Sequence, residues 1–177
     1  RLDGTFGLGA SRLELAAGYE RNRRREFEDR TATDVALGLL SQNYTLDARL
    51  FHAPVGRMSG TLGVSGLRTT FDKFGEETLI PNTTVNAVGL YGFEQVHGGQ
   101  WDISFGARYD YRTLALRDTT IAGVDTDRSW NSFTGNLGLL YKLAEPAAVV
   151  LNVGRGFRAP SSFDLFSNGV HEGTVAF

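Results

Sequence analysis

The sequence predicts an all-β protein, an antiparallel up-and-down β-barrel wall that crosses a membrane. Three observations lead to this prediction. Apolar and polar residues alternate with period two over stretches of about nine to sixteen residues, whereas strands of soluble proteins average about five or six. Short turns and long polar loops join these stretches alternately. Aromatic residues recur near the ends of the stretches, as in the interfacial girdles of membrane barrels.

Composition limits the alternatives. The chain has 177 residues and a formal net charge of −2, with 41% hydrophobic and 21% charged residues. These values suit a folded domain and give no electrostatic case for a nucleic-acid partner. The absence of cysteine excludes disulfides and Cys-ligated zinc. No apolar run approaches the roughly 18–20 residues of a membrane helix. Since Met58 is the only methionine and no leader sequence is recognisable, we expect a fragment of a longer protein.

The stretch from Trp101 to Arg112 shows the alternation most clearly. One face carries Trp101, Ile103, Phe105, Ala107, Tyr109 and Tyr111, and the other carries Asp102, Ser104, Gly106, Arg108, Asp110 and Arg112. A helix would spread both sets around its circumference, so this stretch is predicted to be a strand with one lipid-facing and one lumenal face.

Similar alternation predicts about eight strands in all, with a possible ninth starting near Thr174. The other strands are expected around residues 2–8, 13–19, 40–50, 58–64, 85–93, 133–141 and 149–153. Within 85–93, the pattern assigns Val85, Ala87, Tyr91 and Phe93 to the lipid face. Val88 and Leu90 make the opposite face of that stretch apolar as well.

The connections fall into two alternating classes. Short turns with Gly or Pro are predicted at residues 9–11, 52–56, 97–100 and 142–146. Long polar loops are predicted at about 23–33, 71–83, 113–129 and 157–173. Outer-membrane barrels have short periplasmic turns and long extracellular loops, so the long loops are expected to lie outside the cell.

Aromatic positions fit the height of a membrane wall. From Trp101 to Tyr109 or Tyr111, a strand tilted by about 40° rises about 20–25 Å, close to the expected apolar band. Trp101 is therefore assigned to the periplasmic girdle, and Tyr109 and Tyr111 to the outer one. Further girdle candidates are Tyr19, Tyr44, Tyr91 and Tyr141. A soluble antiparallel sandwich would alternate too, but strand length and the asymmetric connections favour the membrane.

One segment near the end of the chain carries candidate metal ligands. Asp164, His171 and Glu172 supply oxygen and imidazole donors of the kind that zinc and other divalent metals prefer. Alternatively, Ser162, Asp164 and Asn168 cap and hydrogen-bond a folded loop.

Arginines form the other candidate contacts. Arg155 and Arg158 flank the end of the last strand, and they are predicted to contact the lumen or a plug domain. Arg158 has the phase of the lumenal face and could pair with a carboxylate or bind an anion. The run from Arg21 to Arg25 is expected in a long loop, where it contacts lipopolysaccharide phosphates or pairs with the acidic residues that follow.

Enzyme chemistry has no recognisable signature. Nucleophile-elbow, phosphate-loop and His-Glu-x-x-His motifs are absent, and the three histidines lie far apart in the sequence. We therefore expect no catalytic residues, no enzyme activity and no resident cofactor, although zinc or a metal chelate could be a transported ligand. The least favoured interpretation of the chain is an outer-membrane hydrolase.

Three segments resemble those of TonB-dependent outer-membrane receptors. They are Arg158-Ala159-Pro160-Ser161 with Asp164-Leu165-Phe166 and Asn168-Gly169-Val170-His171, then Gly75-Glu76-Glu77 with Ile80-Pro81, and Gly106-Ala107-Arg108-Tyr109-Asp110. The Asn-Gly-x-His version resembles the branch that includes zinc-uptake receptors. By resemblance, this branch makes His171, and with it Asp164 and Glu172, metal-contacting positions.

The resemblance implies a 22-stranded barrel in the outer membrane of a Gram-negative-type bacterium. Residues 1–177 would be a partial barrel domain, with the plug and the remaining strands outside this chain. The implied partners are outer-membrane lipid, the receptor's own plug and the TonB complex. The implied function is energised uptake of a metal ion or small metal chelate. The alternative is a small closed eight-stranded barrel with a structural or adhesion role.

Overall fold

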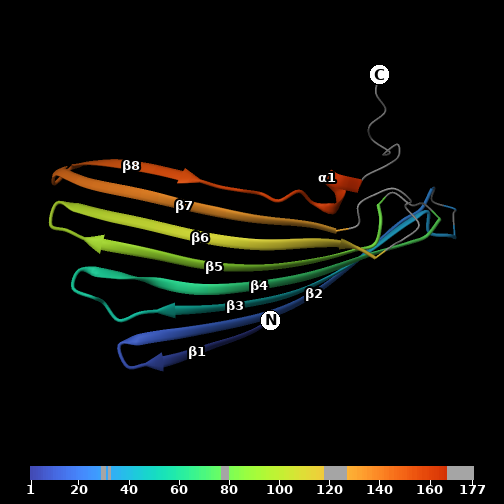
Figure 1. Cartoon of the computed structure of the whole chain (residues 1–177), viewed down its shortest axis with the longest axis horizontal. Helices are drawn as coiled ribbons and strands as arrows, with labels where there is room; N and C mark the ends of the chain where they lie inside the picture. Colours follow the sequence, from blue (N-terminus) through green and yellow to red (C-terminus); the bar gives the residue numbers. More distant parts are fainter. Residues whose placement is uncertain (29–30, 32, 77–79, 118–126, 167–177) are drawn as a thin grey trace, which may run out of the picture.

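The computed structural model describes residues 1–28, 31, 33–76, 80–117 and 127–166. They form one curved sheet of eight antiparallel strands in sequence order, each hydrogen-bonded to its neighbours along the chain (Figure 1). The all-β, up-and-down prediction is confirmed. The position near Thr174, where a ninth strand was expected, lies outside the described residues.

The strands are long. Their bounds are β1 (Leu2–Leu8), β2 (Ser11–Glu26), β3 (Leu37–Phe51), β4 (Met58–Phe74), β5 (Thr83–His97), β6 (Trp101–Leu116), β7 (Asp127–Ala144) and β8 (Ala147–Arg155). β2 to β7 each contain 15 to 18 residues, whereas crossing the apolar layer takes about 9–11. The strands run several residues into the segments predicted to be long loops, so those predicted boundaries were wrong at the strand ends.

Short turns gather at one end of the sheet and long connections at the other (Figure 1). Gly9 follows β1 with a φ of 64° and begins a two-residue loop before Ser11. A glycine with positive φ at the first central position is typical of a type II′ hairpin turn, whose twist matches that of the strands. We call the two ends of the sheet the short-turn end and the long-loop end.

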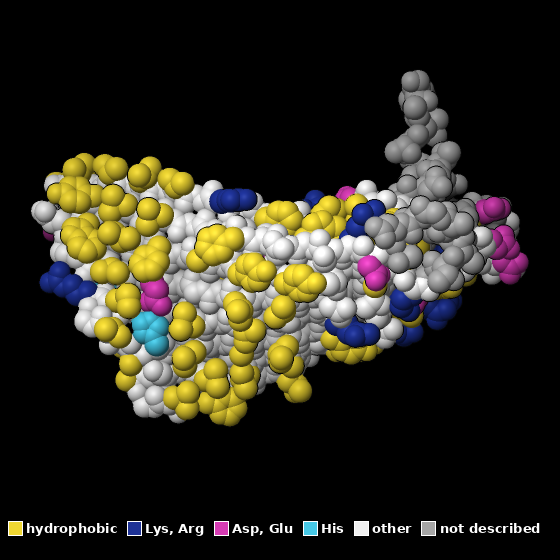
Figure 2. Space-filling view, in the orientation of Figure 1, with side chains coloured by type: hydrophobic (Ala, Val, Ile, Leu, Met, Phe, Trp, Pro, Cys, Tyr) yellow, Lys and Arg dark blue, Asp and Glu magenta, His cyan; other side chains and the backbone are white. Residues whose placement is uncertain are grey.

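The two faces of the sheet differ in chemistry. The strand register aligns Val64, Leu90, Tyr109 and Phe133 in one row across β4 to β7. All four side chains are exposed, and exposed apolar side chains cover much of this face (Figure 2). We call it the outward face, because an apolar band of this kind suits lipid. The opposite, lumenal face carries most of the charged side chains of the central strands.

The phase of β5 differs from the prediction. Tyr91 lies opposite Gly63 and Arg108, and its hydroxyl donates to Asp47 Oδ2 at 3.1 Å. Tyr91 and its in-phase neighbour Phe93 are therefore lumenal, and Leu90 faces outward. The assignment of Tyr91 to the lipid girdle was wrong because β5 is apolar on both faces, which removes the contrast on which phase assignment depends.

The buried core is small and lies at the long-loop end. Val85 of β5 and Leu114 of β6 are directly opposite each other, and Leu114 is fully buried. Ile80 and Pro81, from the connection before β5, are fully buried too. After β8 the chain continues to the five-residue helix α1 (Ser162–Phe166). Among the described residues, no helix has the length and apolar character needed to span a membrane.

Candidate functional site

A charged network occupies the lumenal face of β3 to β6. Arg108 and Asp110 are two residues apart on β6 and therefore point to the same side. The Arg108 guanidinium donates to Asp110 from Nε at 2.7 Å and from Nη2 at 2.6 Å, and Nη2 also donates to Ser65 Oγ on β4 at 2.9 Å. The guanidinium carbon lies 5.3 Å from the centre of the Tyr91 ring. This geometry fixes Arg108 from three strands.

Tyr91 connects this pair to a second one on β3. Arg49 donates through Nε to Asp47 and to the Tyr91 hydroxyl at 3.2 Å. The Tyr91 hydroxyl in turn donates to Asp47. Gly63 provides the space, because a Cβ at that position would overlap the Tyr91 ring. The lumenal wall is therefore braced across β3, β4, β5 and β6 by polar side chains.

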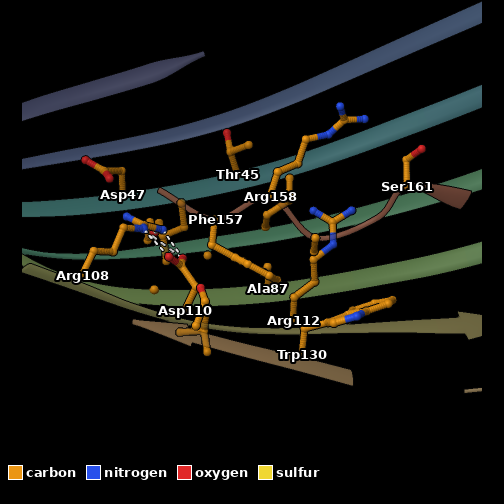
Figure 3. Close-up of a pocket in the computed structure, with 18 residues that line it drawn as sticks. Thr45, Asp47, Ala87, Arg108, Asp110, Arg112, Trp130, Phe157, Arg158 and Ser161 are labelled. Carbon is orange, nitrogen blue, oxygen red and sulfur yellow. Dashed lines mark hydrogen bonds and ion pairs between the residues drawn. The ribbon is translucent and has the colours of Figure 1, made fainter. Parts of the chain in front are cut away.

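The segment after β8 returns across this face. Ser162 Oγ lies 3.1 Å from Thr83 Oγ1 at the start of β5, and the Phe163 ring meets the Phe71 ring of β4 edge-on with centroids 5.6 Å apart. Residues 157–161 thereby form the roof of a cavity of about 630 Å³, and the strands β3 to β7 form its floor (Figure 3). We call it the roofed cavity.

The charges around the roofed cavity are almost balanced. Three pairs account for most of them: Asp47 with Arg49, Asp110 with Arg108, and Asp164 with Arg158 at 3.2 Å. The remaining charged side chain is that of Arg112. Its side chain points from β6 toward the segment between Arg158 and Ser161 (Figure 3), and its Nε is buried without a hydrogen-bond partner in the part of the chain that the structure describes. Among the described residues, the cavity therefore carries one uncompensated positive charge.

Comparison with known proteins supplies the family. The model of the family described as "TonB dependent receptor-like, beta-barrel" matches residues 1–177. The chain belongs to the TonB-dependent receptors. It is similar to lactoferrin-binding protein A of Neisseria meningitidis serogroup B (strain ATCC BAA-335 / MC58), with 33% identity over 75 residues. That match covers 42% of this chain and 7% of the relative's length. Family and relative place the receptor in a Gram-negative outer membrane.

Of the predicted metal-contacting positions in this receptor, the structure describes Asp164. Its Oδ2 accepts hydrogen bonds from the Ser161 backbone N–H and hydroxyl, both at 2.8 Å, while Ser161 Oγ accepts from the Asp164 N–H. This reciprocal pairing caps the start of α1. The Ser161 bonds, together with the nearby Arg158 charge, lower the pKa of Asp164.

The other two metal-contacting positions, His171 and Glu172, lie outside the described residues. Within the described ranges, no three His, Asp or Glu side chains are grouped closely enough to hold a metal ion. The contacts of Asp164 are those of the capping alternative, with Ser161 in place of the expected Ser162.

The two predicted lumenal arginines differ in placement. Arg158 lines the roofed cavity. Arg155 lies opposite Gly135, in phase with the outward-facing Val153, so its side chain leaves the strand on the outward face. The lumenal assignment of Arg155 is therefore corrected. Contact of either residue with a plug stays a prediction.

Apart from Tyr91, the predicted girdle residues share the outward face of the receptor. Trp101 lies opposite Tyr141 near the short-turn end, and Tyr109 and Tyr111 follow in the same phase of β6. Tyr19 and Tyr44 form a tilted ring pair with centroids 5.0 Å apart. Contact of these rings with lipid stays a prediction.

Sequence reasoning did not single out six lumenal residues as site residues, namely Asp47, Arg49, Ser65, Tyr91, Arg112 and Trp130, although the alternation had already placed Arg112 on the lumenal face. One signal was available, since Asp47 with Arg49 and Arg108 with Asp110 are opposite charges two residues apart on a strand. His52 was also missed. It is half-buried and its Nε2 lies 2.9 Å from Glu94 Oε2.

Proposed function

We propose that this chain is part of the barrel of an outer-membrane active-transport receptor that takes up a small metal chelate through TonB. The observation that carries the proposal is the division of the sheet of a TonB-dependent receptor into an apolar outward face and a braced, charged lumenal face. A transport barrel needs both, because its wall must contact lipid and a polar interior at once. The receptor's own plug and the TonB complex are the proposed partners. Members of such a family act as transporters rather than enzymes.

The charge balance of the roofed cavity supports a chelate over a bare cation. Asp47, Asp110 and Asp164 are each paired with an arginine, and Arg112 is left without a partner among the described residues. A free divalent cation would gain little there, whereas an anionic chelate would satisfy the guanidinium. A zinc or other metal contact at His171 and Glu172, with Asp164 released from Ser161, is the companion proposal for the long-loop end.

Uptake by whole cells tests the transport proposal. The full-length receptor is expressed in a host that lacks other receptors for the chelate, and accumulation of labelled metal is followed with and without TonB. We expect TonB-dependent accumulation from an anionic carboxylate chelate. Equal accumulation in the receptor-deficient host, or uptake that does not depend on TonB, would contradict the transport proposal.

The metal-contact proposal has its own measurement. Calorimetry on the full-length receptor is expected to show zinc affinity at least about tenfold weaker in His171→Ala, the loss expected for one ligand or its immediate partner. His97→Ala is the matched control, since His97 lies at the short-turn end. Unchanged zinc affinity in His171→Ala would remove that residue from the site.

The relative's name brings a second candidate, binding of lactoferrin by the long loops. Cells displaying the full-length receptor would then retain labelled lactoferrin, and cells without it would not. The small eight-stranded barrel with a structural or adhesion role remains the alternative to transport. It requires β1 and β8 to pair with each other, which cysteine cross-linking between the two edge strands would detect.

A further inference from the structure

The outer part of β2 is a strand with two different faces, although the sequence suggested a loop there. Arg21, Arg23 and Arg25 lie opposite Gln42, Leu40 and Gly38 of β3. They have the phase of Tyr19 and therefore lie on the outward face. Arg24 has the opposite phase and forms an ion pair with Glu26 at 2.6 Å. The arginine run is thus separated into three outward cations and one paired, lumenal cation.

A fourth cation joins them on β4. Arg68 lies directly opposite Tyr44 of β3, and Tyr44 lies opposite Tyr19 of β2. Arg68 is exposed and therefore stands in the same row as the tilted Tyr19–Tyr44 pair. We call Arg21, Arg23, Arg25 and Arg68 the outer arginine patch. Figure 2 shows Lys and Arg side chains gathered toward the long-loop end, beyond the hydrophobic side chains of the strands.

The charge of this patch is not balanced by the residues that the structure describes. Arg21, Arg25 and Arg68 make no hydrogen bond or ion pair with any residue that the structure describes. Arg23 stacks on the Phe74 ring at 4.7 Å, which leaves the edges of its guanidinium free. The nearby outward carboxylate, Asp72, is already paired with Arg117 at 2.7 Å. The patch therefore presents four positive charges on the side of the wall that meets lipid.

The height of the patch matches the headgroup layer. At about 3.3 Å per residue and a tilt near 40°, Arg21 and Arg23 rise about 5 and 10 Å above Tyr19. Tyrosines mark the edge of the apolar layer, and the polar layer beyond it is about 5–8 Å deep in each leaflet. Arg21 therefore lies at the depth of the lipid headgroups, while the backbones of Arg23 and Arg25 stand about 2 and 7 Å beyond that layer, so that their long side chains can return to it.

We propose that the outer arginine patch binds the phosphate groups of outer-leaflet lipids. A guanidinium offers two parallel donors that match a phosphate, and the free charges of the patch face the layer in which lipid phosphates lie. The site is independent of transport through the lumen, because its residues are on the other face of the wall. It holds phosphorylated lipid at β2 to β4.

Binding of a purified phosphorylated lipid tests the proposal. The full-length receptor in neutral detergent is titrated with lipid A, which carries phosphates, and with its enzymatically dephosphorylated form. We expect Arg21→Gln/Arg25→Gln to bind lipid A at least tenfold more weakly than the wild type. Neither arginine has a partner among the described residues, so this variant leaves the intramolecular contacts intact. The wild type is expected to lose affinity for the dephosphorylated lipid by a similar factor.

Two control variants isolate the position of the charge. Arg57→Gln removes an exposed arginine at the short-turn end, and Arg24→Gln removes the lumenal neighbour within the same run. Both are expected to bind lipid A as the wild type does. If Arg21→Gln/Arg25→Gln does not fold, Arg68→Gln serves in its place, with about threefold weaker binding expected.

Three results would overturn the proposal. They are equal affinity of the patch variant and the wild type for lipid A, equal affinity of the wild type for both lipid forms, and complete displacement of lipid A by millimolar inorganic phosphate. The last result would identify a site for small anions rather than for lipid.

Discussion

Tyr91 and Arg108 lie directly opposite each other on β5 and β6, with the guanidinium carbon 5.3 Å from the ring centre. This pair joins the two arginine–aspartate pairs of the lumenal wall, since Tyr91 also contacts Asp47 and Arg49. It also fixes the phase of β5, because a shift of one residue would turn Tyr91 toward lipid and separate all four side chains.

Loss of the Tyr91 hydroxyl should weaken the hydrogen-bonded network that braces the lumenal wall. Tyr91→Phe removes one hydrogen bond from Arg49 and one to Asp47, so we expect the free energy of unfolding to fall by about 0.5–1.5 kcal/mol. Urea unfolding of the full-length receptor in lipid vesicles measures this change in the free energy of unfolding. Tyr109→Phe is the matched control, since Tyr109 faces outward on β6 and has no hydrogen bond through its hydroxyl to a described residue. Equal effects of the two variants would contradict the brace.

Arg108 should matter more than Tyr91. Arg108→Met leaves the Asp110 carboxylate without its donors, and we expect the free energy of unfolding to fall by about 1–3 kcal/mol. The second substitution Asp110→Leu should restore part of that loss, because an unpaired charge costs more than an absent pair. The same vesicle assay applies, and a double variant less stable than Arg108→Met would argue against the pairing.

The two faces of β7 should differ in how strongly an introduced arginine changes stability. Leu137 faces outward beside Phe105, halfway along the predicted membrane span, and Asn136 faces the lumen. Leu137→Arg is expected to lower the free energy of unfolding in vesicles by about 2–4 kcal/mol, the cost of an arginine near the bilayer midplane. Asn136→Arg should change it by much less. A reversal of that order would mean that the outward face is not the lipid face.

His52 should make stability depend on pH at the short-turn end. The hydrogen bond to the Ala53 carbonyl, and then the contact with Glu94, raise the pKa of His52 above its ordinary value of 6.5. Because the folded pKa is the higher one, the stabilisation is fully present below about pH 6.5 and disappears as the pH rises through the folded pKa. We expect His52→Gln to flatten the stability profile between about pH 6 and 9. An unchanged profile would show that His52 does not titrate in this way.

The lowered pKa of Asp164 predicts that the stability of α1 depends on pH in the opposite way. Hydrogen bonds from Ser161, aided by Arg158, lower the pKa of Asp164 below its ordinary value of 3.8. Its stabilising effect is therefore present above about pH 4 and disappears as the pH falls through the folded pKa. Hydrogen exchange over residues 157–166 should quicken in Asp164→Asn at neutral pH and resemble that of the wild type in acid. Ser161→Ala should act similarly.

The strand pattern was accessible to sequence reasoning where the two faces differ sharply in polarity. β6 has aromatic and charged residues in strict alternation, so its phase followed directly, and the phases of β2, β3 and β7 followed in the same way. β5 failed because Val88 and Leu90 alternate with Val85, Ala87 and Tyr91, all of them apolar or aromatic. The strand ends were misplaced because polar residues above the membrane look like loop residues.

The lumenal site was less accessible, because it depends on register between strands. Tyr91 meets Asp47 across 44 residues of sequence, and no local pattern predicts that contact. The roofed cavity requires in addition that the segment after Arg155 turns back over β5 and β4. The Arg-Ala-Pro-Ser motif indicated a corner but not its direction.

The length of the strands has a consequence for what the receptor can meet outside the cell. A strand of 18 residues, as in β7, rises about 45 Å at a tilt near 40°, while the apolar band takes up about 25 Å. The loops at the long-loop end therefore start from a collar of paired strand ends that rises beyond the apolar band. A macromolecule as large as a folded protein could engage that collar without touching the membrane, and a loop could change in length or sequence without disturbing the wall beneath it.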